Sequence, residues 1–254
     1  MGHIIDISHH QDPSKINYAK LCSQLDMAII RVQYGSRVID KHYKAHIAEM
    51  KKHNVPFGVY AWVRGVNERD MEVEATDFYN RSKDLNPAFY VLDVEEKSMA
   101  NMRTGINAYI AKLRTLTNKK IGIYIGHHLY KEFNLDLSKA DFIWIPHYGR
   151  NDGTVNSKPS FPCDIHQYTD KGRLNGYSGY LDLNRLMGTK PLEFFIEEKK
   201  EVIKVDKKDN KPSSWANESW EWAKKEKITD GINPKSYATR EEVVAMIYRS
   251  RKVK

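Results

Sequence analysis

Two acids close a strand-like segment near the middle of the chain. The segment from Phe89 to Lys97 reads FYVLDVEEK, and Asp93 and Glu95 follow its apolar run. Burying a carboxylate is costly unless it is paired, hydrogen-bonded or neutralised. Because side chains alternate along a strand, Asp93 and Glu95 point to the same side. A pair of carboxyl groups presented in this way can act as acid and partner in the cleavage of a glycosidic bond.

Two further acids lie in strand-like segments at the two ends of the first 190 residues. Asp6 belongs to HIIDIS, and Asp182 belongs to GYLDLNRL. The first and the eighth strand are neighbours in a closed barrel, so these two acids should come close to each other. Four carboxyl groups around one site repel one another. The pKa of at least one of them should therefore rise, so that this group keeps its proton and can donate it at neutral pH.

Aromatic side chains stand near the ends of several strand-like segments, as expected of a groove that binds sugar rings. Any single one of them also suits packing, so the prediction depends on the joint pattern. The predicted substrate-binding residues are Tyr60, Trp62, Tyr124, Trp144 and Tyr148, with Gln167 as a polar contact.

A D-x-E sequence at the end of a strand has other uses. Its oxygens can bind Mg²⁺ or Ca²⁺, and its carboxylates can form a buried salt-bridge network with Arg31. Zinc is not indicated, because the sequence contains neither H-E-x-x-H nor paired cysteine spacing. It also lacks the G-x-S-x-G motif of serine hydrolases and a Walker loop. Mg²⁺ or Ca²⁺ binding by the D-x-E oxygens stays an alternative, and no metal or organic cofactor is implied by the predicted enzyme.

Short apolar runs and helical segments must position these residues. The strand-like runs, rich in Ile, Val, Tyr and Phe, are 3–8, 27–35, 57–63, 89–95, 121–126, 142–149, 165–169 and 179–186. Helical patterns separate the early runs and cover 12–25, 41–53, 67–85, 101–116 and 127–133. The connections between the last three runs show no helical period.

Alternating strands and helices predict an α/β fold with a parallel sheet. The runs are almost continuously apolar, which indicates burial on both faces. We predict an irregular TIM-like (β/α)8 barrel with eight strands and about five helices, plus a small α-helical C-terminal domain. An open, doubly wound sheet is the alternative. It requires a glycine-rich phosphate loop after the first strand, where this chain has SHHQDP.

The chain is predicted to have three parts: a barrel over 1–190, a linker over 191–213 and a small helical domain over 214–254. The linker is charge-dense and contains Pro212 and two serines. In the last part, Trp215, Ser219 and Trp222 fall on one helical stripe. About forty residues make a marginal core, so this part should dock on something, pair with a partner or form a homodimer.

Positive charge is concentrated in the tail. The net charge is +8; the chain from Lys199 onward holds 15 Lys/Arg and 9 Asp/Glu, and the part before it holds 26 and 24. A basic tail favours anionic partners such as nucleic acid, anionic lipid or an acidic cell wall, although it can simply be a soluble lysine-rich segment. No nucleic-acid module is recognisable, so no nucleic-acid partner is predicted.

The remaining sequence features are membrane-spanning stretches, targeting signals and cysteines. No stretch is long and apolar enough to span a membrane. The start, MGHIIDIS, lacks the basic n-region of a signal peptide, so we expect synthesis in a cytoplasm without such a signal. Cys22 and Cys163 form neither a disulfide framework nor a metal pattern.

Three segments resemble glycoside hydrolase family 25, the Chalaropsis-type lysozymes that are common as phage endolysins and secreted muramidases. They are HIIDISHHQ, YVLDVE and IHQYTDKGRLNGYSGYLDLNRL, within residues 3–188. The resemblance implies an irregular barrel and cleavage of the β-1,4 bond between N-acetylmuramic acid and N-acetylglucosamine in bacterial peptidoglycan. It implies that Glu95 is the general acid, Asp93 its partner carboxylate, and Asp6 and Asp182 the flanking acids.

Two departures from the family pattern concern His166, where the family often has tryptophan, and Pro146, in place of a smaller residue. Both are expected to affect substrate contacts more than catalysis. The tail resembles a single S-layer-homology repeat, which implies attachment to the cell wall, with anionic wall polymers as the expected ligand. A phage or prophage endolysin that acts at the wall would fit these features.

Two other functions stay open. A chitinase-like barrel usually has D-x-x-D-x-D-x-E on its fourth strand, but here Ala88 and Val91 replace the first two acids. A non-catalytic sugar-binding barrel would keep the aromatic residues and could lose the acids, all four of which are present.

Overall fold

The chain forms two compact units, residues 1–198 and 199–254. The computed structural model describes residues 2–196, 211–232, 234 and 240–251, and the two units are treated separately below. Most of the expected linker, residues 197–210, lies outside the described residues.

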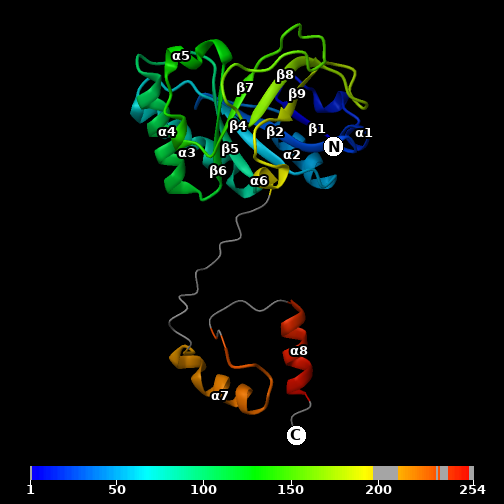
Figure 1. The fold of residues 1–254 in the computed structure, drawn as a ribbon, viewed down its shortest axis with the longest axis vertical. Helices are drawn as coiled ribbons and strands as arrows, with labels where there is room; N and C mark the ends of the chain where they lie inside the picture. Colours follow the sequence, from blue (N-terminus) through cyan, green and yellow to red (C-terminus); the bar gives the residue numbers. More distant parts are fainter. Residues whose placement is uncertain (1, 197–210, 233, 235–239, 252–254) are drawn as a thin grey trace. The chain divides into compact units, whose positions relative to one another are not determined.

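The first unit is a closed barrel of eight strands with helices outside it (Figure 1). The barrel closes because β1 pairs with both β2 and β9. A ninth, two-residue strand, β3, pairs only with β2 at the rim. The strands are β1 His3–Ile7, β2 Leu25–Tyr34, β3 Val38–Ile39, β4 Phe57–Trp62, β5 Phe89–Val94, β6 Lys120–Ile125, β7 Phe142–Pro146, β8 Ile165–Gly172 and β9 Leu181–Leu186. The predicted eight-stranded α/β barrel is confirmed.

The direction of the last strand corrects the expectation of a parallel barrel. Neighbouring strands from β1 to β8 are parallel within the barrel, but β9 runs antiparallel to both β8 and β1. The reason is the connection between β8 and β9, which contains no crossover helix. Parallel neighbours need such a long crossover, whereas a short connection joins antiparallel strands.

Helices cover the outside of the early strands. They are α1 Tyr18–Cys22, α2 Tyr43–Lys52, α3 Glu68–Ser82, α4 Met102–Leu116 and α5 Tyr130–Phe133. Asn67 and Asn101 cap α3 and α4 by accepting hydrogen bonds from the first turns. The predicted helix 12–25 is corrected: it contains a short 3-10 turn, Pro13–Lys15, and α1, and Leu25 already pairs with His3 as part of β2.

Two apolar cores lie on the two faces of the barrel wall. One lies between strands and helices. The other fills the barrel interior with large rings, among them Phe89, Phe142 and Trp144. Glycines on the neighbouring strands make room for these rings: a Cβ at Gly58 would lie 2.1 Å from the Phe89 ring, and one at Gly122 would lie 2.3 Å from the Phe142 ring.

Residues expected to begin the linker instead complete the barrel core. Leu192–Ile196 form the short helix α6 at one end of the barrel (Figure 1). Its Phe195 is fully buried, with its ring 5.1 Å from Phe142 and 6.2 Å from Phe89. Both of those residues start their strands. The helix therefore closes the end of the barrel where the parallel strands begin.

Replacing Phe195 with alanine should lower the free energy of unfolding of the first unit by about 3–5 kcal/mol, because it removes a fully enclosed ring. Urea unfolding followed by far-UV circular dichroism measures this. Phe194→Ala is the matched control, since Phe194 is only partly buried, and it should cost clearly less. Equal losses for the two variants would contradict the closing role of Phe195.

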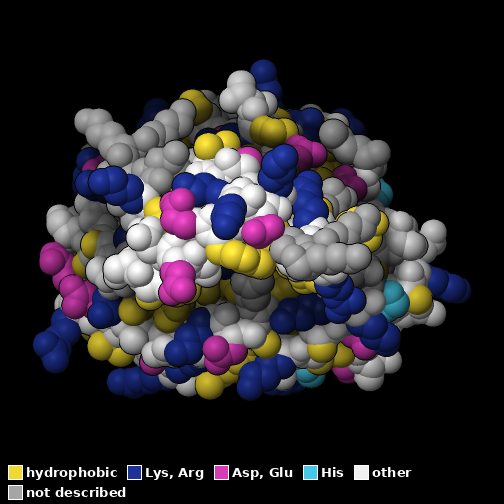
Figure 2. All heavy atoms as spheres, turned by 90° about the horizontal axis from the view of Figure 1, so that it is seen from below, with side chains coloured by type: hydrophobic (Ala, Val, Ile, Leu, Met, Phe, Trp, Pro, Cys, Tyr) yellow, Lys and Arg dark blue, Asp and Glu magenta, His cyan; other side chains and the backbone are white. Residues whose placement is uncertain are grey.

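The second unit contains α7, Asn217–Lys225, and α8, Arg240–Ser250. Its side chains leave much apolar surface open: Trp215 is 87% exposed and Trp222 is 48% exposed. Figure 2 draws the side chains of both units, and Lys and Arg occur at many separate places in that view. Among the described helices, none combines the length and apolarity that crossing a bilayer requires.

Candidate active site

The acids of β5 lie together where the strand ends. Asp93 is 4% exposed, and Glu95, directly after the strand, is partly exposed. Burial and their mutual repulsion raise the pKa of Asp93 well above its ordinary value, and burial also raises the pKa of Glu95. A hydrogen bond joins the two carboxyl groups. The pair therefore holds a proton more tightly than two exposed acids would, and Glu95 is its solvent-facing member.

Asp6 and Asp182 face each other across the β1–β9 pair. They are direct partners in the antiparallel register, and a hydrogen bond joins their carboxyl groups. Burial raises the pKa of Asp6 to about 6. Burial and the charge of Asp6 raise the pKa of Asp182 to about 9. Because β9 runs backwards, the start of β9 meets the carboxyl end of β1, and this brings Asp182 to the same mouth as Asp93.

Two amides hold Asp6 in place. Gln167 Nε2 and Asn184 Nδ2 each donate to Asp6 Oδ2 at 2.8 Å. Hydrogen bonds to a carboxylate favour its charged form, and they oppose the effect of burial on the pKa of Asp6. Sequence reasoning missed Asn184. The signal was present, since Asp182 and Asn184 are two residues apart on one strand and share a face.

Three of the predicted substrate-binding residues contact the two amides that hold Asp6. Trp144 is 1% exposed, and its Nε1 donates to Asn184 Oδ1 at 2.8 Å. Tyr124 and Tyr148 donate to Gln167 Oε1 at 2.9 Å and 2.6 Å. These three side chains therefore support the amides that hold Asp6, and the enclosed Trp144 presents no open ring face for a sugar.

Tyr60 and Trp62 lie on β4 beside the acids. Tyr60 is buried, and its ring packs edge-on against Trp144 with centroids 6.4 Å apart. Trp62 is half-buried, is the register partner of Asp93 and packs against Tyr34. A sugar contact by either residue stays a prediction, with Trp62 the more accessible of the two.

The salt-bridge alternative for the D-x-E pair is not what the structure shows. Arg31 pairs with Asp40 at 3.0 Å, and its positive charge lowers the pKa of Asp93 only from a distance. Glu96, which points to the other side of the strand, pairs with Arg64 at 2.6 Å. Asp93 Oδ1 is buried and accepts no hydrogen bond from the described residues. Such an uncompensated buried oxygen is costly in a purely structural role.

Of the two departures from the family pattern, His166 lies away from the groove, whereas Pro146 shares the inward face of Gln167. His166 is fully buried; its Nε2 contacts the backbone oxygen of His147, and its Nδ1 accepts from Arg185 Nε. Because Gln167 points into the barrel, the adjacent His166 points outward, so it supports the loop rather than the groove. Pro146 ends β7 as the register partner of Gln167. Within the described part of the chain, no group of three or more His, Cys, Asp or Glu is placed to hold a metal ion.

The fold and the site together define the class. Four carboxyl groups with raised pKa values meet at the mouth of an α/β barrel, where barrel enzymes carry their chemistry. A glycoside hydrolase uses a pair of carboxyl groups: one donates a proton, and the other stabilises the positive charge that develops on the sugar.

Comparisons with known proteins identify the family. The model of glycosyl hydrolases family 25 matches residues 5–177, and the chain belongs to this family. Lysozyme M1 of Streptomyces globisporus is 27% identical over 73% of this chain and 67% of its own length. The solved structure of GHIP, a glycosyl hydrolase 25 of Streptococcus pneumoniae, is 40% identical, covers 77% of this chain and 92% of its own, and has a TM-score of 0.74. The catalytic domain of endolysin ply40 from Listeria monocytogenes bacteriophage P40 is 29% identical over 74% of this chain and 94% of its own, with a TM-score of 0.70.

Replacing Asp6 with asparagine should move the alkaline limb of the kcat/KM profile to lower pH by about one unit. The charge of Asp6 raises the pKa of Asp93 and of Glu95. With its own pKa of about 6, Asp6 is charged at neutral pH, where the limb is expected. Removing that charge makes the acid pair lose its proton at lower pH, and activity falls with it.

The measurement is a pH profile of reducing-end release from purified walls. Asp84→Asn, at an exposed acid in the turn before β5, is the matched control and should leave the limb where it is. A limb that stays in place, or moves to higher pH, in Asp6→Asn would exclude this coupling.

Proposed function

We propose that this protein is a lysozyme, an N-acetylmuramidase that hydrolyses the β-1,4 bond between N-acetylmuramic acid and N-acetylglucosamine in bacterial peptidoglycan. The observation that carries the proposal is the position of Glu95, a partly exposed acid with a raised pKa beside the buried Asp93. Lysozyme M1 and the ply40 endolysin domain support the choice of substrate.

In the proposed reaction, Glu95 donates its proton to the glycosidic oxygen as the bond from the anomeric carbon to that oxygen breaks. Asp93 either attacks the anomeric carbon or orients the substrate's N-acetyl group, whose oxygen attacks instead. Water then attacks the anomeric carbon, the bond to Asp93 or to the N-acetyl oxygen breaks, and the proton lost by the water returns to Glu95. In both routes the group bonded to the anomeric carbon is displaced twice, each time with inversion. The product therefore keeps the stereochemistry of the substrate. Asp6 and Asp182 set the charge around this pair.

The geometry gives less support to a chitinase-like enzyme. At the place of one missing acid, Val91 is fully buried in the barrel interior and packs in its apolar core. A sugar-binding barrel without catalysis would leave the raised pKa values and the unpaired Asp93 oxygen without a use.

Purified walls test the proposal. The protein should reduce the turbidity of a wall suspension, and the new reducing ends should belong to N-acetylmuramic acid. New reducing ends on N-acetylglucosamine would indicate a glucosaminidase or chitinase-like specificity. Binding to walls without any new reducing end would indicate a sugar-binding module.

We also propose that residues 214–254 attach the enzyme to anionic wall polymers, as expected of a phage or prophage endolysin that acts at the cell wall. The exposed rings of Trp215 and Trp222 and the excess of Lys and Arg after Lys199 support this. Deleting residues 206–254 should lower retention on sedimented walls, and unchanged retention would count against attachment. Light scattering of the full chain and of the deletion variant tests the alternative, a homodimer formed through this part.

A further inference from the structure

A cavity opens at the rim of the barrel, over strand ends close to those that carry the four acids. It has a volume of about 540 Å³, and its lining includes His9, Arg31, Val38, Ile39, Lys41 and Trp62. Trp62 is the register partner of Asp93, and His9 follows β1, which carries Asp6. The cavity therefore lies at the same mouth of the barrel as the acids, over the ends of β1, β2 and β4.

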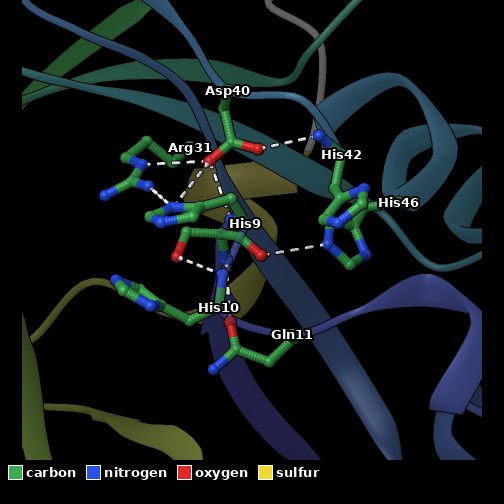
Figure 3. A network of polar contacts seen from close by, with 8 residues as sticks. His9, His10, Gln11, Arg31, Asp40, His42 and His46 are labelled. Atoms are coloured by element: carbon green, nitrogen blue, oxygen red, sulfur yellow. Dashed lines mark hydrogen bonds and ion pairs between the residues drawn. The ribbon is translucent and has the colours of Figure 1, made fainter.

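A buried polar network shapes this cavity (Figure 3). Asp40 accepts from Arg31 Nε at 3.0 Å, from the His9 backbone N–H at 2.8 Å and from the His42 backbone N–H at 2.9 Å. Deeper in the network, His46 Nε2 lies 3.2 Å from the Ser8 backbone oxygen. These contacts tie the loop after β1 to the β3–α2 connection. The walls are thus held in place before any ligand arrives.

The lining combines positive charge with open apolar surface. Asp40 is the one acid among the lining residues, all of which the structure describes, and Arg31 and backbone donors already engage both of its oxygens. Lys41 is exposed at the rim. The Arg31 guanidinium also contacts His9 Nδ1 through Nη2, and among the described residues its Nη1 has no hydrogen-bond partner. Val38 and Ile39 of β3 are 54% and 52% exposed.

We propose that this pocket binds the peptide branch that muramic acid carries on its lactyl group, while the sugar chain lies across the acids. This inference rests on the muramidase function proposed above and adds a determinant of specificity to it. Wall peptides carry carboxylates and small apolar side chains, which suit Arg31, Lys41 and the β3 surface. A bare glycan of N-acetylglucosamine is neutral and offers no carboxylate to the cationic groups of the pocket.

Two forms of one substrate test the proposal. One is soluble glycan strands with uncross-linked peptides; the other is the same strands after an amidase has removed the peptides. Removing the peptide frees the lactyl carboxylate that the amide bond had blocked, so the stripped strands still carry a negative charge beside the sugar. A preference for the peptide-bearing strands therefore cannot come from that charge alone. The wild-type KM should be about tenfold lower on peptide-bearing strands. Val38→Asp and Lys41→Glu, which place negative charge in the pocket, should bring the two KM values to within about threefold.

The matched control is Val73→Asp. Val73 lies on α3, is 48% exposed and does not line the pocket, so the preference for peptide-bearing strands should persist. Equal wild-type KM values on the two strands, with normal turnover, would overturn the pocket and leave the muramidase function standing. An equal loss of preference in Val73→Asp and Val38→Asp would also overturn it. If the wild type released no reducing ends from either strand, both proposals would fall.

Discussion

Glu95→Gln is expected to lower kcat on purified walls by about a thousandfold. Glutamine keeps the shape of the side chain but has no proton to donate to the glycosidic oxygen. The fold should be unaffected, because burial already disfavours the charged form of Glu95, as its raised pKa shows, and the amide is neutral. Initial rates of reducing-end release at saturating wall concentration give kcat, and circular dichroism verifies the fold.

Glu96→Gln is the matched control for this experiment. Glu96 is the next residue, but it points to the other side of the strand and pairs with Arg64 at 2.6 Å. That exposed pair contributes little to stability, so the variant should keep a kcat within about twofold of the wild type. Near-normal turnover of Glu95→Gln would remove the central assignment, and an equal loss in both variants would point to damage in the loop instead.

Asp93→Asn should have the second largest effect, a loss of about a hundredfold or more in kcat. The amide can neither attack the anomeric carbon nor stabilise a positive charge on the sugar or on its N-acetyl group. Asp93 is buried with a pKa well above its ordinary value, so a neutral replacement should cost little stability. The assay is the same release of reducing ends, with Asp84→Asn as the control. Retention of more than about a tenth of the activity would exclude both roles of Asp93.

The two roles of Asp93 are separable with a second substrate. Strands in which the N-acetyl group of muramic acid has been removed lack the internal attacking oxygen. If Asp93 orients that group, the wild type should lose about a hundredfold or more on these strands. If Asp93 is itself the nucleophile, the wild type should lose much less, and a covalent sugar–enzyme species should be detectable by mass spectrometry.

Local pattern was enough to predict the strands, most of the helices and the shared face of Asp93 and Glu95. Alternation along a strand is a property of the backbone, so two acids at spacing two face one way wherever that strand lies. The capped starts of α3 and α4 are equally local, because Asn67 and Asn101 bond to N–H groups within three residues. The resemblance of the quoted motifs to the family supplied what alternation alone could not, the kind of bond that is cleaved.

Tertiary structure decided which of these local faces meet. The reversal of β9 brings Asp182 against Asp6, and strand direction depends on connections and long-range pairing rather than on the period of apolar residues. Phe195, in a segment whose charge suggested a linker, is buried because the open end of the barrel lies beside it. Trp144 has the residue type of a sugar platform, yet packing encloses it and makes it a support for Asn184. A residue's type and its neighbours in the chain carry no information on such burial, since burial is set by the surfaces that fold over the residue from elsewhere.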